Sequence, residues 1–426
     1  MRKHRPVAAL ALATFGLATP AQAQAAGLNG ADTAWILAAT CLVLMMTIPG
    51  LALFYGGLVR KKNVLSTLMQ SFAACCLVTI LWVSLGYSLA FDGNGPLLGG
   101  LGKTFLSGIG KDSLTGSIPE FLFMTFQMTF AIITPAVICG AFADRMKFSA
   151  LLWFLGAWLL LVYCPVAHWV WGGGFLSRWG FADFAGGAVV EVNSGVAGLV
   201  AAVMLGKRRG YPTEPMPPHN LVISVAGASL LWVGWLGFNG GSALAANATA
   251  ALALANTQIA GAAAALAWLA AEWRIHQRPS VLGIVTGAVA GLVAITPSCA
   301  FVSPAGALVI GLAAGLGCFL AATTLKRRMG YDDSLDVFGV HGIGGVIGLL
   351  GIGLLAQSSM GGVSGVVEGN LTQLGIQLAG TAIVALWCAV ITFAILKAID
   401  LLHGLRVTRE VEIEGLDVNL HGEVVP

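Results

Sequence analysis

Apolar runs long enough to cross a membrane dominate this chain of 426 residues. Apolar residues make up 57% of the sequence and charged residues only 10%, a composition that excludes a soluble globular domain. A helix needs about 20 apolar residues to span the hydrocarbon, so each run predicts one crossing. Eleven such runs follow an N-terminal leader: 34–59, 65–91, 120–143, 148–165, 185–206, 221–238, 248–273, 281–297, 304–325, 338–356 and 374–396. The sequence therefore predicts an all-α polytopic membrane protein with eleven transmembrane helices.

Basic side chains lie almost entirely in one alternate set of the loops between these runs. That set holds Arg60, Lys61, Lys62, Arg145, Lys147, Lys207, Arg208, Arg209, Arg274, Arg278, Lys326, Arg327 and Arg328, whereas the other set holds Lys103, Lys111 and Arg178. Because basic loops stay in the cytoplasm, we expect the mature N-terminus outside and the tail, residues 399–426, inside. The net charge of +3 reflects this loop bias, so no nucleic-acid partner is predicted.

The first residues have the pattern of a secretory signal peptide. Basic residues at the start precede a short apolar stretch, 7–17, which is followed by the small-residue site Ala21-Gln22-Ala23. These are the three parts of a cleavable leader. We therefore predict that residues 1–23 are removed and that residues 24–398 form the membrane domain. An uncleaved anchor is the alternative.

Three short motifs recur along the chain with an offset of five runs. The pairs are Phe54-Tyr-Gly-Gly57 with Phe238-Asn-Gly-Gly241, Ile133-Thr-Pro135 with Ile295-Thr-Pro297, and Glu191-Val-Asn-Ser-Gly195 with His341-Gly-Ile-Gly-Gly345. Because five is odd, the two copies must have opposite orientations in the membrane. The sequence thus predicts an inverted repeat, about 34–206 and 221–356, with the eleventh helix as an addition.

Two ionisable residues interrupt apolar runs at matching places in the two halves. Glu191 lies in 184–202, and His341 lies in 338–355. An ionisable group at membrane depth is costly, so its default interpretation is functional. A carboxylate next to an imidazole can attract a cation and pass protons, and each group would need the other as its partner. The alternative is a buried pair that only holds two helices together.

Aromatic residues gather near the predicted outer helix ends. They include Phe126 and Phe130, which lie four apart on one helix face, together with Trp171, Trp235 and Phe238. With the nearby hydroxyl of Ser242, they suggest a cation–π vestibule for an ammonium-type cation. Core or interfacial packing is the alternative for each of them. Asp183, which opens the fifth run, is better explained as a helix N-cap than as a direct ligand.

Motifs for catalysis or metal binding are missing from the sequence. It contains no HExxH, GxSxG or phosphate-binding loop, and its eight cysteines fall in or near apolar runs without metal-ligand spacing. Ser242 with His341 is a faint match to an intramembrane serine protease, but the two residues lie at different predicted depths. We therefore predict no enzyme activity, no cofactor and no metal.

The sequence resembles the ammonium transporter (Amt/Mep/Rh) family, in particular its bacterial channels, over nearly the whole mature chain. The motifs that carry the resemblance are Ile48-Pro-Gly-Leu-Ala-Leu-Phe-Tyr-Gly-Gly57, Ala167-His-Trp-Val-Trp-Gly-Gly-Gly174, Asp183-Phe-Ala-Gly-Gly187, Gly234-Trp-Leu-Gly-Phe-Asn-Gly-Gly-Ser-Ala243, Asp336-Val-Phe-Gly-Val-His-Gly342 and Glu414-Gly-Leu-Asp-Val-Asn-Leu-His-Gly422. The resemblance implies a multi-pass protein of the bacterial inner membrane. It also implies a homotrimer with one pore per subunit, and a PII-type regulatory protein as a partner at the cytoplasmic face.

The resemblance also assigns roles to individual residues. It implies an outer ammonium site built by Phe126, Trp171 and Ser242 and supported by Asp183. It implies a gate of Phe130 and Phe238 above a narrow apolar pore. His341 matches the second of the family's two pore histidines, whereas Glu191 stands in place of the first, as in certain fungal members.

These residues suggest a mechanism in which ammonium is held at the mouth, deprotonated, and conducted as ammonia. Glu191 and His341 would pass the proton separately, which would make uptake electrogenic. An ammonium sensor acting through a cytoplasmic partner is the first alternative. A cation-coupled secondary transporter that uses Glu191 is the second, although an aromatic vestibule does not suit sodium.

Overall fold

The computed structural model describes residues 27–426, so the predicted signal peptide lies outside the described residues. The first half contains α1 (Gly30–Met45), η1 (Met46–Leu51), α2 (Ala52–Leu58), η2 (Lys61–Asn63), α3 (Val64–Leu81), η3 (Trp82–Gly86), α4 (Tyr87–Phe91), η4 (Thr104–Leu106), the paired strands β1 (Leu114–Thr115) and β2 (Ile118–Pro119), α5 (Glu120–Ile138), η5 (Cys139–Phe142), α6 (Phe148–Trp158), η6 (Leu159–Tyr163), α7 (Cys164–Val170), α8 (Phe175–Arg178), η7 (Gly187–Val192) and α9 (Asn193–Leu205). The second half contains α10 (Leu221–Gly241), α11 (Ala248–His276), α12 (Val281–Ile295), α13 (Pro304–Leu320), η8 (Ala321–Leu325), α14 (Lys326–Met329), η9 (Phe338–Gly342), α15 (Ile343–Leu355), α16 (Ser358–Gly361), η10 (Val366–Glu368), α17 (Leu371–Leu402), α18 (Arg409–Glu414) and η11 (Asp417–His421).

Helices occur at all eleven positions that the apolar runs predict. Within residues 27–426, ten continuous helical segments are long and apolar enough to cross a membrane. The helix at the eighth position, α12, is apolar but has only 15 residues. The predicted class, an all-α polytopic membrane protein, is therefore confirmed. The count of eleven crossings and their orientation stay predictions.

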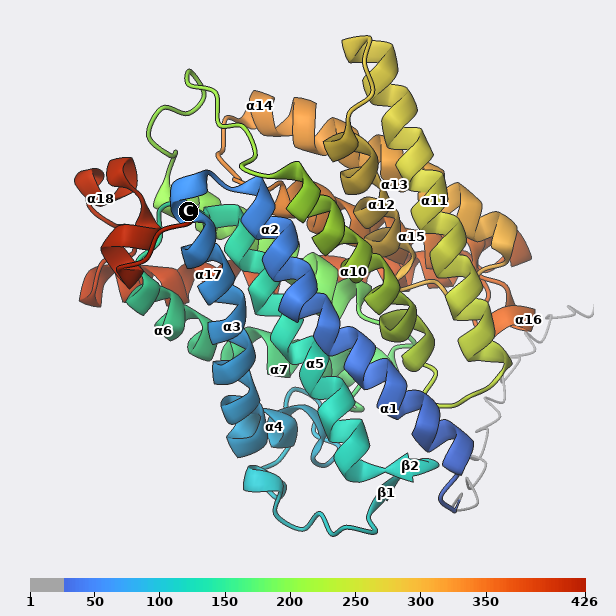
Figure 1. Cartoon of the computed structure of the whole chain (residues 1–426). Helices are drawn as coiled ribbons and strands as arrows, with labels where there is room; N and C mark the ends of the chain where they lie inside the picture. Colours follow the sequence, from blue (N-terminus) through green and yellow to red (C-terminus); the bar gives the residue numbers. More distant parts are fainter. Residues whose placement is uncertain (1–26) are drawn as a thin grey trace, which may run out of the picture.

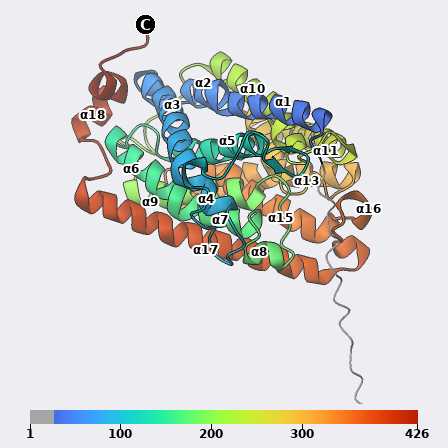
Figure 2. The ribbon, with the colours of Figure 1, turned by 90° about the horizontal axis from the view of Figure 1, so that it is seen from below.

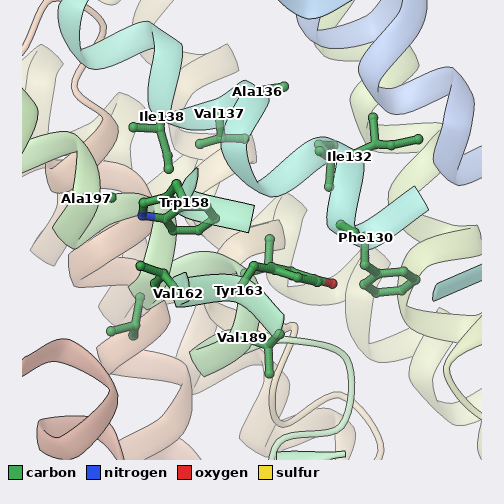
Figure 3. Close-up of a cluster of buried hydrophobic side chains, with 14 of the residues drawn as sticks. Phe130, Ile132, Ala136, Val137, Ile138, Trp158, Val162, Tyr163, Val189 and Ala197 are labelled. Carbon is green, nitrogen blue, oxygen red and sulfur yellow. The ribbon is translucent and has the colours of Figure 1, made fainter. Parts of the chain in front are cut away.

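The helices form one bundle (Figure 1). Among its ten long segments, the one that contains α5, Glu120–Phe142, is the most buried. Most side chains of α5 are buried, and Figure 3 shows them meeting side chains of α6, η6 and η7 in the core. The long helix α17 runs along the outside of the bundle (Figure 2), where it packs on α6, α9 and α15. The eleventh predicted helix thus adds to a bundle that the two halves form together.

Glycines allow the two halves to meet at the level of Glu191 and His341. A Cβ atom added to Gly195 would lie 2.2 Å from the backbone nitrogen of Gly342, just after His341. At the matching position of the other half, a Cβ added to Gly345 would lie 2.9 Å from the Cβ of Glu191. Each glycine therefore makes room for the backbone that carries the ionisable residue of the opposite half.

A carboxylate starts each of the two π-helices that carry these residues. Asp183 accepts backbone N–H groups at the start of η7, and Asp333 accepts the N–H of Phe338 at the start of η9, at 2.8 Å. Each aspartate lies eight residues before the ionisable residue of its half, Glu191 or His341. Such caps satisfy N–H groups that have no partner within the helix and complement the helix dipole.

The C-terminal tail folds back onto the N-terminal end of α3 (Figure 1). The carboxylate of Asp417 accepts the backbone N–H groups of Leu65, at 3.0 Å, and Ser66, at 2.8 Å. Glu412 is buried and bonds with Arg406 and with the backbone N–H of Arg209. The tail is therefore an ordered part of this face, held by buried carboxylates.

The close approach at Gly195 leads to a prediction about stability. Replacing Gly195 by alanine forces apart two backbones, and such overpacking costs about 1–3 kcal/mol or more. We expect the Gly195→Ala protein to unfold at a clearly lower temperature in detergent, as followed by size-exclusion chromatography after heating. Gly375→Ala on α17 is the matched control, because no atom lies within 4 Å of its added Cβ. Equal unfolding temperatures for the two variants would contradict this account of the helix crossing.

Asp333 leads to a prediction about pH. Burial raises the pKa of this carboxyl from 3.8 to about 6, and Asp336 adds to the rise. A raised pKa favours the protonated form in the folded protein, so stability falls as the pH rises through about 6. The Asp333→Asn protein has no charge to bury, and its advantage over the wild type should grow by about 1.5 kcal/mol from pH 5 to pH 8, because about half of the total effect already occurs between pH 3.8 and pH 5. Unfolding midpoints across this range measure the difference, and a constant difference would refute the argument.

Candidate functional site

Three cavities lie in series between the two faces of the bundle. The first, of about 380 Å³, is lined by Phe130, Trp171 and Ser242 among others. The second, of about 10 Å³, is lined by Phe238, Glu191 and His341. The third, of about 290 Å³, is also lined by His341 and widens among polar residues. Six of the predicted site residues thus line these cavities, and His341 lines both the second and the third cavity.

Trp171 and Ser242 both line the first cavity. The indole N–H of Trp171 donates to the backbone oxygen of Asp183 at 2.9 Å, which fixes the ring. The hydroxyl of Ser242 donates to the backbone oxygen of Phe238 at 2.8 Å. Since a hydroxyl has one hydrogen, the lone pairs of Ser242 are left to accept a hydrogen bond from a bound donor.

Phe126 is placed differently from the other predicted residues of the outer site. Its side chain is completely buried, it packs against Phe130 with ring centroids 5.0 Å apart, and it is not among the residues that line the first cavity. The cavity wall is formed instead by Phe123 and Gln127 of the same helix. Phe123, Gln127 and Phe130 follow one another at intervals of four and three residues, a spacing that places them on one face of the helix and that can be read from the sequence.

Phe130 and Phe238 separate the first cavity from the second. Their ring centroids lie 4.1 Å apart with an interplanar angle of 34°, and each side chain is about 1% exposed. The rings come from α5 and α10, which lie in opposite halves of the chain. The edge of this stack faces Trp171, whose ring centroid is 5.9 Å from that of Phe130. The stack therefore closes the path between the two cavities in this conformation.

Glu191 and His341 contact each other below the aromatic stack. The Nδ1 atom of His341 lies 2.6 Å from Oε2 of Glu191, and the side chains are 8% and 1% exposed respectively. The residues that line the second cavity together with Glu191 and His341 are apolar, among them Val137 and Leu231. A carboxyl oxygen and an imidazole nitrogen at this distance can share one proton in a hydrogen bond. The arrangement can therefore take up and release a proton within an apolar passage.

Asp183 serves as a helix cap in the structure. One oxygen accepts the N–H groups of Gly186 and Gly187, and the other accepts those of Ala188 and Val189, at 2.6 to 3.3 Å. Burial raises the pKa of this carboxyl, whereas these N–H groups lower it. Both oxygens are thus engaged by the backbone of η7. Because its backbone oxygen also holds Trp171, Asp183 positions the outer cavity and the helix of Glu191 together.

The third cavity contains polar residues that our sequence interpretation missed. Glu272 and His276 lie four apart near the end of α11, and Asp336 and Ser334 lie just before η9. The spacing of Glu272 and His276 by four residues indicates that they share one face of a helix, but no sequence pattern indicates that they line the same cavity as His341. Within residues 27–426, no cluster of three or more metal-ligating side chains occurs.

Comparisons with known proteins agree with this geometry. The model of the Ammonium Transporter Family matches residues 34–425. The chain is 48% identical to the ammonium transporter of Bacillus subtilis, over 92% of this chain and 97% of the relative. It is 42% identical to ammonium transporter Amt1 of Archaeoglobus fulgidus, over 93% of this chain and 99% of the relative.

Solved structures resemble the fold as well. The crystal structure of Saccharomyces cerevisiae Mep2 has a TM-score of 0.84 and 35% identity, with 90% of this chain and 88% of that chain covered. A sensor Amt protein has a TM-score of 0.85 and 29% identity, with 92% and 98% covered. Both the sequence matches and the structural matches span almost the full length. The chain therefore belongs to the Ammonium Transporter Family.

Proposed function

We propose that this protein transports ammonium across the membrane by separating it into ammonia and a proton. The observation that carries the proposal is the order of groups along the path. An aromatic and hydroxyl cavity is followed by stacked phenylalanines, an apolar passage with the Glu191–His341 pair, and a polar cavity. Relatives that are named ammonium transporters support the choice of substrate.

The outer cavity would hold the ammonium ion. A cation over an aromatic face gains about 2 kcal/mol or more when it is desolvated, and Trp171 and Phe130 supply such faces. The lone pairs of Ser242 would add a charge-assisted hydrogen bond of about 1.5–3 kcal/mol. These terms compensate for partial loss of water at the mouth. They do not compensate for moving a bare cation through an apolar passage, which costs tens of kcal/mol.

Deprotonation removes that cost, because ammonia is neutral. Phe130 and Phe238 would open for ammonia as the gate, and the proton would travel through Glu191 and His341. A carboxyl in contact with an imidazole gives the proton a place to reside at the middle of the path. The transported species would then be ammonia plus one proton, so uptake would be electrogenic. Transport is preferred to sensing because the path continues to the third cavity beyond His341.

The proposal also covers the location, the oligomeric state and the regulatory partner of the transporter. We infer an inner-membrane location with residues 24–398 as the membrane domain and residues 399–426 in the cytoplasm, as the loop charges indicate. We also infer a homotrimer and a PII-type regulatory partner at the cytoplasmic face. The ordered tail and the basic loops beside it offer that partner a defined surface.

Paired measurements of flux and current test the transport mechanism. The purified protein in sealed proteoliposomes should show ammonium uptake together with a current on a solid-supported membrane. Glu191→Gln should lower the ratio of current to flux at least about tenfold, because an amide does not accept the proton. Glu120→Gln is the control, since this carboxylate is buried against Tyr87 away from the path. Uptake without current in the wild type would refute the electrogenic mechanism, and no uptake would refute transport.

Ser242 tests the outer site. Loss of its acceptor should weaken binding by about 1.5 kcal/mol, so Ser242→Ala should raise the KM for ammonium about tenfold with little change in the maximal rate. Ser229→Ala is a matched control on the same helix, because its hydroxyl makes the same bond to a backbone oxygen four residues earlier but lies on the exposed face. An unchanged KM for Ser242→Ala would remove this residue from the site.

A further inference from the structure

His168 occupies an unusual position next to the outer cavity. It lies in α7 and its side chain is completely buried. Its Nδ1 atom is 2.9 Å from the backbone oxygen of Ala90, and its Nε2 atom is 2.7 Å from the backbone oxygen of Gly95. Both ring nitrogens therefore face backbone carbonyls, and the transport path does not include this histidine.

Carbonyl oxygens only accept hydrogen bonds, which restricts the protonation of this ring. A neutral imidazole has one N–H donor and one nitrogen lone pair. With a neutral ring, one of the two contacts would set a lone pair against a carbonyl oxygen. Only the doubly protonated ring donates to Ala90 and Gly95 at the same time. Gly95 belongs to a half-exposed loop, so protons can reach this ring from the solvent at the outer face.

The ring belongs to a row of contacts that holds the outer loop, residues 90–97. The donors come from residues 168–178, and every acceptor is a backbone oxygen of that loop. Besides the two bonds of His168, this row contains three further hydrogen bonds to backbone oxygens. Trp169 Nε1 donates to Leu97 at 2.7 Å, the N–H of Phe175 donates to Pro96 at 3.0 Å, and Arg178 Nη2 donates to Asn94. An indole, an amide and a guanidinium keep their protons at every physiological pH. His168 is the member of this row whose ring can carry either one or two N–H donors.

The same short segment carries Trp171 into the outer cavity. The N–H groups of Gly172 and Gly174 donate to the backbone oxygen of His168 at 3.0 and 2.9 Å. Packing is tight, because a Cβ added to Gly172 would lie 2.0 Å from the Ala90 oxygen and 2.6 Å from Nδ1 of His168. A shift of the imidazole relative to the loop would therefore be passed on to Trp171.

Other charged and titratable groups around the ring are few. The elements that pack against α7 carry Tyr87 and Asp92 at the end of α4, Tyr163 in η6, Arg178 in α8, and Asp183 with Glu191 at η7. Asp92 bonds to the N–H of Gly102, and Asp183 caps η7. Within residues 27–426, no carboxylate forms an ion pair with His168. The ring depends on its two carbonyl acceptors.

We propose that His168 is a proton-dependent positioning residue that fastens the outer loop and thereby sets the affinity of the outer cavity for ammonium. This inference rests on the transport function proposed above. With two protons on the ring, both bonds hold and Trp171 is fixed. When the outside pH rises and the ring loses a proton, one bond is lost, the loop loosens, and the affinity for ammonium falls. External acidity would thus strengthen capture.

Nitrogen NMR of the wild-type protein in lipid tests the protonation directly. Ala167-His168 is the only Ala-His pair in the chain, so carbonyl-labelled alanine with ¹⁵N-labelled histidine identifies this residue without a variant. We expect two protonated ring nitrogens at about pH 5.5 and a change of one of them toward about pH 8. A single protonated nitrogen at the lower pH would overturn the proposal. This measurement does not depend on transport.

Transport kinetics test the consequence. Across this pH range nearly all of the substrate is ammonium, so substrate protonation contributes little. The wild-type KM should rise about fivefold between these pH values, the effect of one lost hydrogen bond. His168→Gln keeps one permanent donor, and its KM should stay at the high-pH value throughout. His219→Gln is the control and should keep the wild-type profile.

The outcomes separate the two proposals. Uptake with the same pH profile in the wild type and in His168→Gln would refute the positioning role and leave transport intact. A wild type without uptake at either pH would refute the transport function itself. Both proteins contain Glu191 and His341, so the difference between their profiles reports on His168 alone.

Discussion

The contact between Glu191 and His341 is the interaction on which the rest of this structure depends. Each side chain is ionisable, almost fully buried, and surrounded by apolar residues. Either one alone would be a buried group without a partner, which costs several kcal/mol. A contact of 2.6 Å lets them share a proton and satisfies both. The fold must therefore bring two residues that are 150 positions apart in the chain into hydrogen-bond distance inside a membrane protein.

Matching features in the two halves of the chain bring the two residues together. One carboxylate cap starts each π-helix, and one glycine on each side lets the opposite backbone approach. The two caps differ in the number of hydrogen bonds that their carboxylate oxygens accept. Asp183 accepts four N–H groups, whereas Oδ1 of Asp333 has no partner among the described residues. The half with the carboxylate in the path is thus held more firmly than the half with the imidazole.

Sequence patterns predicted the parts of this molecule that depend on local periodicity. Apolar runs located the helices, the matching frames predicted the meeting of Glu191 with His341, and the position of Asp183 indicated a cap. Periodicity alone does not decide how a helix is rotated within the bundle. Phe126 and Phe123 lie on the same helix, and only packing decides that the second one faces the cavity. The docked tail and His168 were missed because their partners are backbone atoms distant in sequence, which leave no trace in composition.

The size of the middle cavity limits how a proton can cross the passage. About 10 Å³ is the space of a single water-sized molecule. A continuous file of water therefore does not fit between the phenylalanine stack and His341 in this conformation. In the proposed mechanism, ammonia occupies that space for an instant, and the proton must move over side-chain atoms. The Glu191–His341 pair is the part of the wall that offers such atoms, and His341 delivers them to the wider third cavity. Separation of the proton from ammonia thus follows from the narrowness of the passage as much as from the chemistry of the pair.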